Sequence, residues 1–542
     1  MDRRRGALTT AALAAVPVLF VGVFFAYPVA AILGRGLFPD GSLDLGTLGD
    51  VFRGRQVEIV WFTLQQATIS TALTLAVGIP GAWALSRMRF RGRRIVRALV
   101  VVPFVLPTVV VAVAFRALLG TGGPLGSLDL VPSLWAILAA HVFFNYAVVV
   151  RVVASLWEHL DPSTEEAARV LGAGRVRTFV SITLPALAPA IAAATAIVFL
   201  FTFASFGIVL ILGGPGLSTL ETEIYRQTAL FLDLRTAAAL TLVQLGAIVA
   251  LLTVTGRAQQ RYATAQRLRA TTSIARRART AGERLALGAN LLVMGVLLGA
   301  PLATLALRSL RSTDGALTLD AYRGLDEVRR GPVVIAEPLA AAATSIRYAV
   351  LASVLAVVVG GLAAFAIARG RGRSARMLDG ALALPLGVSA VTVGFGFLVA
   401  LDSPPLDLRG SWVLVPIAQA VVAIPLVVRA VTPAIRAIDP HLREAAAVLG
   451  AGPRRIWREV DLPIARRALL LGAGFSFAIA LGEFGATAFV ARPGSTTLPV
   501  TIYRLLGQPG PGNFGVALAA SVVLMAITAV AILVTDTERL SF

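Results

Sequence analysis

Apolar stretches of about 20 to 30 residues recur twelve times along this chain of 542 residues. An apolar helix needs about 20 residues to cross about 30 Å of hydrocarbon, so each stretch is long enough to span a bilayer. Hydrophobic residues make up 57% of the chain and charged residues only 14%, and a soluble fold has too little interior to hide that much apolar surface. The sequence therefore predicts an all-α integral membrane protein with twelve transmembrane helices. They are expected near 8–33, 58–85, 97–120, 133–157, 187–212, 236–256, 285–307, 339–368, 377–402, 411–431, 467–490 and 514–535.

The positive charge of the chain lies between these stretches. All 49 basic residues are arginine, and the formal net charge is +20. Clusters at 87–97, at 369–376 and in the segment 257–284 fall on one side of the membrane if both termini are cytoplasmic, as the positive-inside rule requires. This distribution argues against nucleic acid. Anionic lipid headgroups of the bilayer would suit the arginines of the segment 257–284, and a plain positive-inside linker explains that segment equally well.

Residue types that many enzymes need are missing. Without lysine the chain has no phosphate-binding loop of the G-x-x-x-x-G-K-[ST] type, and without cysteine it has no thiolate nucleophile or thiolate metal ligand. The three histidines, at positions 141, 159 and 441, are too scattered for a metal cluster. We therefore expect no catalytic site, no bound metal and no cofactor held by this chain.

The second half of the chain repeats the first. Residues 63–87 match 345–369 at an offset of 282, and Ile224-Tyr225-Arg226 matches Ile502-Tyr503-Arg504 at an offset of 278. Chance similarity between apolar helices explains shared Leu and Val, but it does not explain polar pairs at a constant offset. Six spans per repeat is an even number, which predicts two parallel six-helix repeats with the pathway between them. The predicted parts are a first repeat at 1–256, an Arg-rich cytoplasmic linker at 257–284 and a second repeat at 285–542.

Two loops between apolar spans carry the most specific pattern. Residues 161–185 read DPSTEEAARVLGAGRVRTFVSITLP, and residues 439–463 read DPHLREAAAVLGAGPRRIWREVDLP. Each begins with Asp-Pro. This pair indicates the start of a helix, since Asp caps the first amides of a helix and Pro suits its first position. Gly172 and Gly450 suit a left-handed helix end. Each loop is therefore predicted to form two short helices joined at a glycine, a knob on the cytoplasmic side with an apolar ridge and a glutamate that a partner can contact.

The pattern E-A-A, three residues, G, nine residues, I-x-L-P resembles the signature loop of permeases in binding-protein-dependent ABC importers. The first loop fits throughout, and the second departs only where Val460 replaces Ile. The resemblance implies the type I ABC importer permease fold and a coupling role, in which each knob docks on an ATP-hydrolysing subunit. The implied coupling residues are Glu166, Ala167, Ala168, Gly172, Leu184 and Pro185 in the first loop and Glu444, Ala445, Ala446, Gly450, Leu462 and Pro463 in the second.

The same resemblance implies partners, location and solute. Two copies of a cytoplasmic ATP-binding subunit, which use ATP and Mg, and an extracytoplasmic solute-binding protein are expected around a multi-pass chain in a prokaryotic plasma membrane. Two permease units in one chain resemble the group that carries ferric iron, thiamine or phosphonates. The segments 136–145, 203–215 and 220–227 are most similar to thiamine permeases. The implied solute is thiamine or its phosphates, with ferric iron next.

Polar residues inside the predicted spans are candidates for the substrate pathway. Glu483 lies in the eleventh span, and its counterpart in the first repeat is Ser205. An intramembrane acid can attract a cationic solute, although pairing with Arg or accepting hydrogen bonds between helices is its commoner use. His141 and Asn145 lie one turn apart on one helix face and either line the path or bind neighbouring helices.

Phe206 and Phe484 directly follow the matched polar pair and complete the pathway candidates, either as a gate or as core packing. An alternative function is a secondary transporter driven by an ion gradient, because such proteins also have parallel six-span repeats. That mechanism needs titratable groups inside the bundle, for which Glu483 alone is available, and it gives no reason for two Glu-Ala-Ala loops. The predicted function is therefore the permease of an ABC importer.

Overall fold

The computed structural model describes residues 13–540 except 39–40, 43–45, 47–48, 50, 215, 263–274, 313–314, 329–334, 371, 403, 405, 493 and 511. In this part of the chain the secondary structure is helical, apart from two isolated bridges between extended residues. Ten helices are long and apolar enough to cross a membrane, and two pairs of helices pass the same test together, each bent at a short break. The predicted all-α membrane fold is confirmed, and the ten spans with the two bent pairs account for the twelve predicted spans.

Two sets of helices follow one another in the same order. The first repeat contains α2 (Tyr27–Leu37), α4 (Gly54–Arg87), α5 (Arg93–Val105), α6 (Thr108–Leu119), α7 (Leu134–His159), α8 (Ser163–Val170), α9 (Arg175–Thr178), α10 (Leu184–Phe203), α11 (Gly207–Leu212), α12 (Leu220–Ala229) and α13 (Leu234–Tyr262). The second contains α14 (Ala281–Ser309), α15 (Asp320–Arg323), α16 (Pro338–Arg369), α17 (Arg373–Gly387), α18 (Ala390–Ala400), α19 (Leu414–Arg436), α20 (Pro440–Val448), α21 (Pro453–Ile456), α22 (Leu462–Gly482), α23 (Thr487–Val490), α24 (Leu498–Gly507) and α25 (Asn513–Leu540).

The core of each repeat is a three-helix pack made with small residues. In the first repeat α7 lies against α4 and α10, and in the second α19 lies against α16 and α22. A methyl group at Gly78 would lie 2.7 Å from a Val149 methyl, and one at Gly360 would lie 2.9 Å from Val427 Cβ. Gly78 and Gly360, like Val149 and Val427, occupy matched positions of the repeats. Close approach at small residues is how helices associate in a membrane, and both repeats use the same contact.

The third and ninth predicted spans, at 97–120 and 377–402, are bent and not straight. α5 and α6 meet at 103°, and α17 and α18 meet at 94°. Pro107 lacks an amide hydrogen and forces the preceding residue out of the helical region, which ends α5. In the second repeat Ser389 accepts a hydrogen bond from Thr392 N at 3.0 Å and so caps a new helix. The apolar composition continues through both breaks, which is why each sequence segment resembles one span.

The fifth and eleventh predicted spans, at 187–212 and 467–490, are displaced toward the N-terminus, because the continuous helices run over Arg175–Phe203 and Pro453–Gly482. α10 ends at Phe203 and α22 ends at Gly482, and each is followed by a non-helical turn and a short helix. Both are preceded by a π-helical turn, η3 (Phe179–Thr183) or η5 (Trp457–Asp461). The pathway candidates around Ser205 and Glu483 therefore lie in turns and not inside straight spans.

The first helix of each repeat packs on the other repeat. α2 lies against α13 of its own repeat and α18 of the second, while α14 lies against α25 of its own repeat and α6 of the first. A methyl group at Gly396 of α18 would lie 2.9 Å from Pro28 Cβ, so the exchanged helix makes a close contact. Each repeat thus covers part of its partner.

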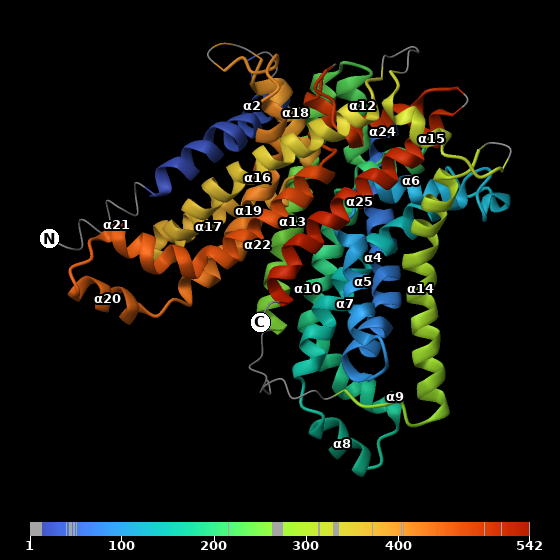
Figure 1. Cartoon of the computed structure of the whole chain (residues 1–542), viewed down its shortest axis with the longest axis vertical. Helices are drawn as coiled ribbons and strands as arrows, with labels where there is room; N and C mark the ends of the chain where they lie inside the picture. Colours follow the sequence, from blue (N-terminus) through green and yellow to red (C-terminus); the bar gives the residue numbers. More distant parts are fainter. Residues whose placement is uncertain are drawn as a thin grey trace.

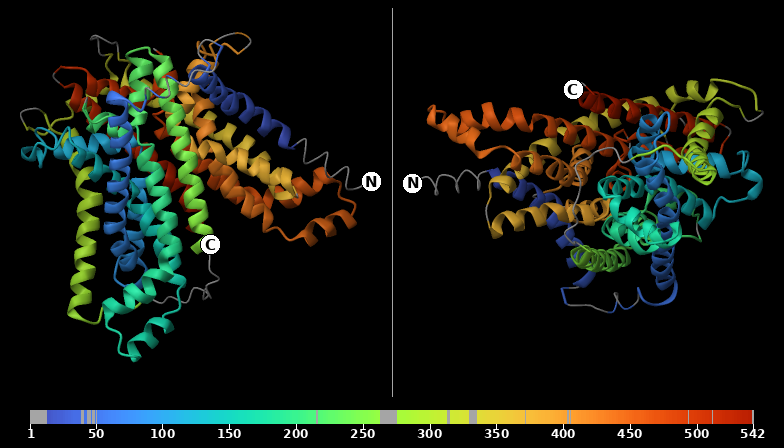
Figure 2. Two further views of the ribbon diagram at one scale, coloured as in Figure 1. Left: turned by 180° about the vertical axis from the view of Figure 1, so that it is seen from behind. Right: turned by 90° about the horizontal axis from the view of Figure 1, so that it is seen from below.

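The long helices of the two repeats diverge from one end of the molecule (Figures 1 and 2). α12 and α24 lie close together at that end, whereas α8 and α20 lie at the far ends of the diverging bundles and well apart. The repeats therefore meet on one side of the protein and are separated on the other. The predicted boundaries at 256 and 285 stay predictions, and residues 263–274 of the predicted linker lie outside the described residues.

Candidate coupling knobs and translocation pathway

The two predicted knobs have the same backbone. In the first knob α8 leads through Gly172 to α9, and in the second knob α20 leads through Gly450 to α21. These glycines have φ of +85° and +84°, the left-handed region in which a side chain is strained. In each knob the amide after the glycine donates at 3.0 Å to the carbonyl of the second motif alanine, which closes a Schellman turn. The two bonds run from Ala173 N to Ala168 O and from Ala451 N to Ala446 O.

Each knob presents an apolar ridge beside its glutamate. Val170 and Leu171 are each 87% exposed, and their counterparts Val448 and Leu449 are 87% and 86% exposed. The motif residues Glu166, Ala167, Glu444 and Ala445 are exposed as well, and neither α8 nor α20 buries a residue. The motif ends inside the continuous helix that forms the next span, at the point where Leu184-Pro185 opens α10 and Leu462-Pro463 opens α22. A protruding element with aliphatic side chains in solvent is typical of a docking surface.

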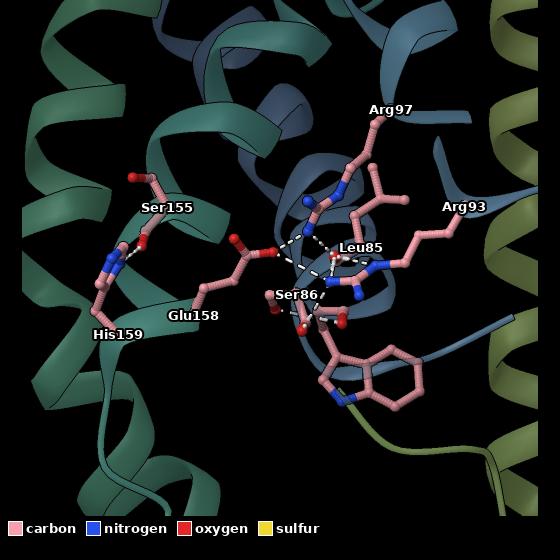
Figure 3. A network of polar contacts seen from close by, with 8 residues as sticks. Leu85, Ser86, Arg93, Arg97, Ser155, Glu158 and His159 are labelled. Atoms are coloured by element: carbon pink, nitrogen blue, oxygen red, sulfur yellow. Dashed lines mark hydrogen bonds and ion pairs between the residues drawn. The ribbon is translucent and has the colours of Figure 1, made fainter. Parts of the chain in front are cut away.

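Two arginines hold the end of α7, from which the first knob departs (Figure 3). Glu158 pairs with Arg93 Nη2 at 3.1 Å and also with Arg97. Both guanidinium groups donate to the Leu85 carbonyl oxygen, at 2.6 and 2.7 Å, near the end of α4. Cations at a helix C-terminus satisfy carbonyls that lack a partner within the helix. The ends of α4 and α7 and the start of α5 are therefore cross-linked at the base of the first knob.

The end of the predicted linker docks at the same base. Arg276 N–H donates to Arg87 O at 3.1 Å, and Arg276 O accepts from Arg89 N at 2.9 Å. The Arg276 guanidinium binds both oxygens of Glu283 on α14, at 3.0 and 2.7 Å, and these hydrogen bonds raise the pKa of Arg276 above its usual value. Arg175 of the first knob lies 3.5 Å from the same carboxylate. Glu283 thus connects the first knob to the first helix of the second repeat.

Four aromatic side chains meet between the repeats. The Phe206 and Phe484 rings are stacked at 5.2 Å between centroids, and both are buried. Tyr225 lies 5.4 Å from Phe206, and Tyr503 lies 5.5 Å from Phe484. The two tyrosine rings are 6.5 Å apart, edge to face. The Phe–Phe pair and the Tyr–Tyr pair each join matched positions, so this aromatic cluster lies where the two repeats touch.

His141 and Asn145 bind neighbouring helices of the first repeat. His141 Nδ1 lies 2.9 Å from Ser70 Oγ on α4, and Nε2 lies 2.8 Å from Ser205 Oγ in the turn after α10. Asn145 donates to the His141 carbonyl oxygen at 3.0 Å. The histidine is buried, so its ring links three elements around the aromatic cluster. Ser70 was not among the predicted residues, because 71 positions separate it from His141.

Glu483 caps the turn after α22. Its carboxylate accepts from Ala486 N at 2.7 Å, from Thr487 N at 3.0 Å and from the Thr487 hydroxyl, and the side chain is buried. Protein donors therefore use both oxygens in this conformation.

A cavity of about 760 Å³ lies between the repeats, next to the end of α24. Arg116 and Ile211 of the first repeat and Leu505 and Phe514 of the second are among the lining residues. The Arg116 guanidinium lies 5.8 Å from the centre of the Phe514 ring, a cation–π contact across the repeats. This cavity and the aromatic cluster lie on the side where the repeats meet.

Comparison with known proteins identifies the family. The family described as "Binding-protein-dependent transport system inner membrane component" matches residues 74–267 and again 356–537. The chain belongs to this family. It carries the family's domain twice, and it is a permease of the ABC importer class.

Relatives of this permease include fused chains of similar length. The probable ABC transporter permease protein y4fN of Sinorhizobium fredii is 28% identical over 96% of this chain and 94% of its own. The thiamine transport system permease protein ThiP of Escherichia coli is 27% identical over 83% of each chain. The crystal structure of a bacterial ABC transporter involved in the import of the acidic polysaccharide alginate covers 48% of this chain and 98% of the matched chain, at 18% identity and a TM-score of 0.42.

Proposed function

We propose that this permease forms the translocation pathway of an ATP-driven importer in a prokaryotic plasma membrane, with both termini cytoplasmic. Two copies of an ATP-binding subunit dock on the two knobs and use ATP and Mg, and a solute-binding protein docks on the opposite face. The observation that carries the proposal is the pair of knobs: two identical backbone turns, each with an exposed Val-Leu ridge beside a glutamate, on matched positions of two parallel repeats.

The separation of the knobs suggests the direction of the motion. The repeats touch at the aromatic cluster and diverge toward the knobs, which corresponds to a pathway that is closed outside and open to the cytoplasm. When ATP draws the docked subunits together, the knobs approach each other and the two repeats rotate about their contact as rigid bodies. The Phe206–Phe484 stack then separates and admits solute from the binding protein.

Thiamine or a thiamine phosphate is the proposed solute, and ferric iron is the next candidate. Relatives named thiamine permeases support this choice, and so does the aromatic cluster, because aromatic rings stack on heteroaromatic rings and attract organic cations. Uptake of labelled thiamine, thiamine phosphate and ferric citrate into proteoliposomes with the complete complex tests the order. Faster uptake of ferric citrate than of both thiamine compounds would reverse it.

Charge reversal on both knobs tests the coupling role. The variant Glu166→Arg with Glu444→Arg is expected to insert normally and to lose at least about tenfold in ATP-dependent uptake, because each docking face then carries the wrong charge. Asp379→Arg is the matched control, since Asp379 is an exposed acid on α17 and lies outside both knobs. Normal uptake by the double variant would contradict the proposal. Loss of wild-type uptake on collapse of the proton gradient, with ATP retained, would favour an ion-driven transporter instead.

A further inference from the structure

Each knob is joined to its repeat by a small ion cluster that connects three elements. In the first repeat, Glu165 of α8 pairs with Arg87, the last residue of α4, at 3.2 Å. Thr183, immediately before α10, donates its hydroxyl hydrogen to the same Glu165 oxygen at 2.9 Å. Arg169, one turn along α8, lies 3.6 Å from the other oxygen. One acid on the knob therefore ties the knob to the second and fifth spans.

The second repeat joins the same three elements with the acid in a different place. Asp461, immediately before α22, is fully buried. One oxygen accepts from Arg443 of α20 at 2.7 Å, and the other pairs with Arg369, the last residue of α16. Here the knob supplies an arginine, and the start of the fifth span supplies the acid.

The members of the two clusters occupy matched positions. Arg87 corresponds to Arg369 at the offset of 282, and at the offset of 278 Glu165 corresponds to Arg443 and Thr183 to Asp461. Each cluster has one acid and two arginines. The second arginine of the first cluster is Arg169, whose counterpart Ala447 is uncharged, and the second arginine of the other cluster is Arg443. The acid has thus moved between two touching positions while the three-way connection persists. Unrelated surface ion pairs would not exchange charge at two positions and keep the same three elements joined.

Burial explains why these contacts matter for the knobs. α8 and α20 bury no side chain, so neither has an apolar anchor that fixes its direction. The acids, in contrast, are shielded: the Glu165 side chain is 17% exposed and Asp461 is fully buried. An ion pair withdrawn from water costs much more to break than an exposed one. The polar clusters are therefore the attachments that orient the knobs.

We propose that Glu165 and Asp461 are positioning residues, which hold each knob rigidly on the second and fifth spans so that a push on the knob moves its repeat. This inference rests on the proposed coupling function. A knob that pivots freely absorbs the motion of the ATPase, whereas a knob fixed to two spans transmits it. The acid can be moved from the knob to the start of the fifth span only if both positions are changed together. A change at one position alone brings two like charges into contact.

The test exchanges the sets in the full chain. Glu165→Arg alone sets a second arginine against Arg87. It is expected to speed hydrogen exchange of the α8 amides about tenfold in nanodiscs, because the helix loses its attachment. Adding Thr183→Asp places the acid where the second repeat has it, with Arg169 retained as a third arginine, and is expected to bring exchange back to within about threefold of the wild-type rate. In the complete complex, ATP hydrolysed per solute moved should rise in the single variant and fall back in the double variant.

The neighbouring residue separates this inference from the proposed function. Glu166→Arg, on the exposed face of the same helix, is expected to leave α8 exchange unchanged. If exchange follows this pattern but Glu166→Arg with Glu444→Arg transports normally, positioning stands and ATPase coupling fails. A double Glu165→Arg, Thr183→Asp variant that exchanges as fast as Glu165→Arg alone overturns the inference. Should Glu165→Arg not fold, Glu165→Gln and the mirror set, Asp461→Thr with and without Arg443→Glu, give the same comparison.

Discussion

The two walls of the pathway share a frame but differ in chemistry. Thr63 of α4 accepts a hydrogen bond from Leu220 N at 3.0 Å, and the matched Ser345 of α16 accepts one from Leu498 N at 2.7 Å, so both repeats cap their short interface helix in the same way. Next to this common frame, the first repeat has the buried Ser70–His141–Ser205 chain. At the matched positions the second repeat has Ala352, Gln419 and Glu483.

This difference shows what fusion of two repeats permits. A homodimeric permease must place the same residue on both walls, whereas a fused chain can vary each wall separately. Positions that set backbone geometry are kept in both copies, and positions that contribute polar groups have diverged. The polar groups between the repeats are therefore asymmetric within a symmetric scaffold.

The largest difference between matched positions is expected for Glu483 and Ser205. Glu483→Ala leaves two buried amides and a hydroxyl without their acceptor, so it should destabilise the protein by about 3 kcal/mol. Ser205→Ala removes one hydrogen bond to His141 and should cost about 1 kcal/mol. Unfolding in mixed detergent micelles measures both. Glu483→Gln keeps the side-chain volume and should leave the preference among solutes unchanged. A changed preference would show that the Glu483 carboxylate contacts the solute in addition to capping the turn.

His141 and Gln419 should differ less. His141→Ala leaves Ser70 and Ser205 without their shared partner, for an expected loss of about 2 kcal/mol. Gln419 already has a buried side-chain oxygen without a hydrogen-bond partner among the described residues, so Gln419→Ala should cost less than about 1 kcal/mol. The same unfolding measurement applies, with His141→Gln as the volume-matched control. Equal losses of stability would mean that the hydrogen bonds of His141 stabilise the first repeat no more than Gln419 stabilises the second.

The smallest difference between matched positions, close to zero, is expected for the capping hydroxyls. Thr63→Val and Ser345→Ala each remove the acceptor for one helix amide and should each cost about 1 kcal/mol. The double variant should cost the sum, because the two sites lie in different repeats. A clearly unequal pair would contradict the shared frame.

Much of the fold follows from the sequence because lipid imposes strong rules on composition. Hydrophobic length located the spans, but it could not locate the breaks at 388–389 and after Phe203, where apolar residues continue through a change of direction. Pro107 was a local signal for the break in the third span, although Pro103 in the same span lies inside α5 and does not end it. Helix packing at Gly78 and Gly360 depends on which helices are neighbours, which composition does not specify.

The candidate site was predicted in part. The knobs follow from local signals, Asp-Pro at the start and glycine at the turn, because these act within a few residues. The His141 network and the ion clusters join residues far apart in sequence, such as Arg369 and Asp461, which are 92 positions apart. The charge exchange between Glu165 and Arg443 was nevertheless visible in the aligned repeats. It becomes interpretable only when Thr183 and Asp461 are found beside them.

The exchange of first helices has a consequence for how such a chain assembles. α2 completes the wall of the second bundle and α14 that of the first, so each bundle alone lacks a side that only the other can provide. Until α14 has been synthesised, the side of α6 that α14 covers has no partner from this chain. A chain that ends before α14 would therefore have all six spans of the first repeat, but its α6 would lack the helix that covers it.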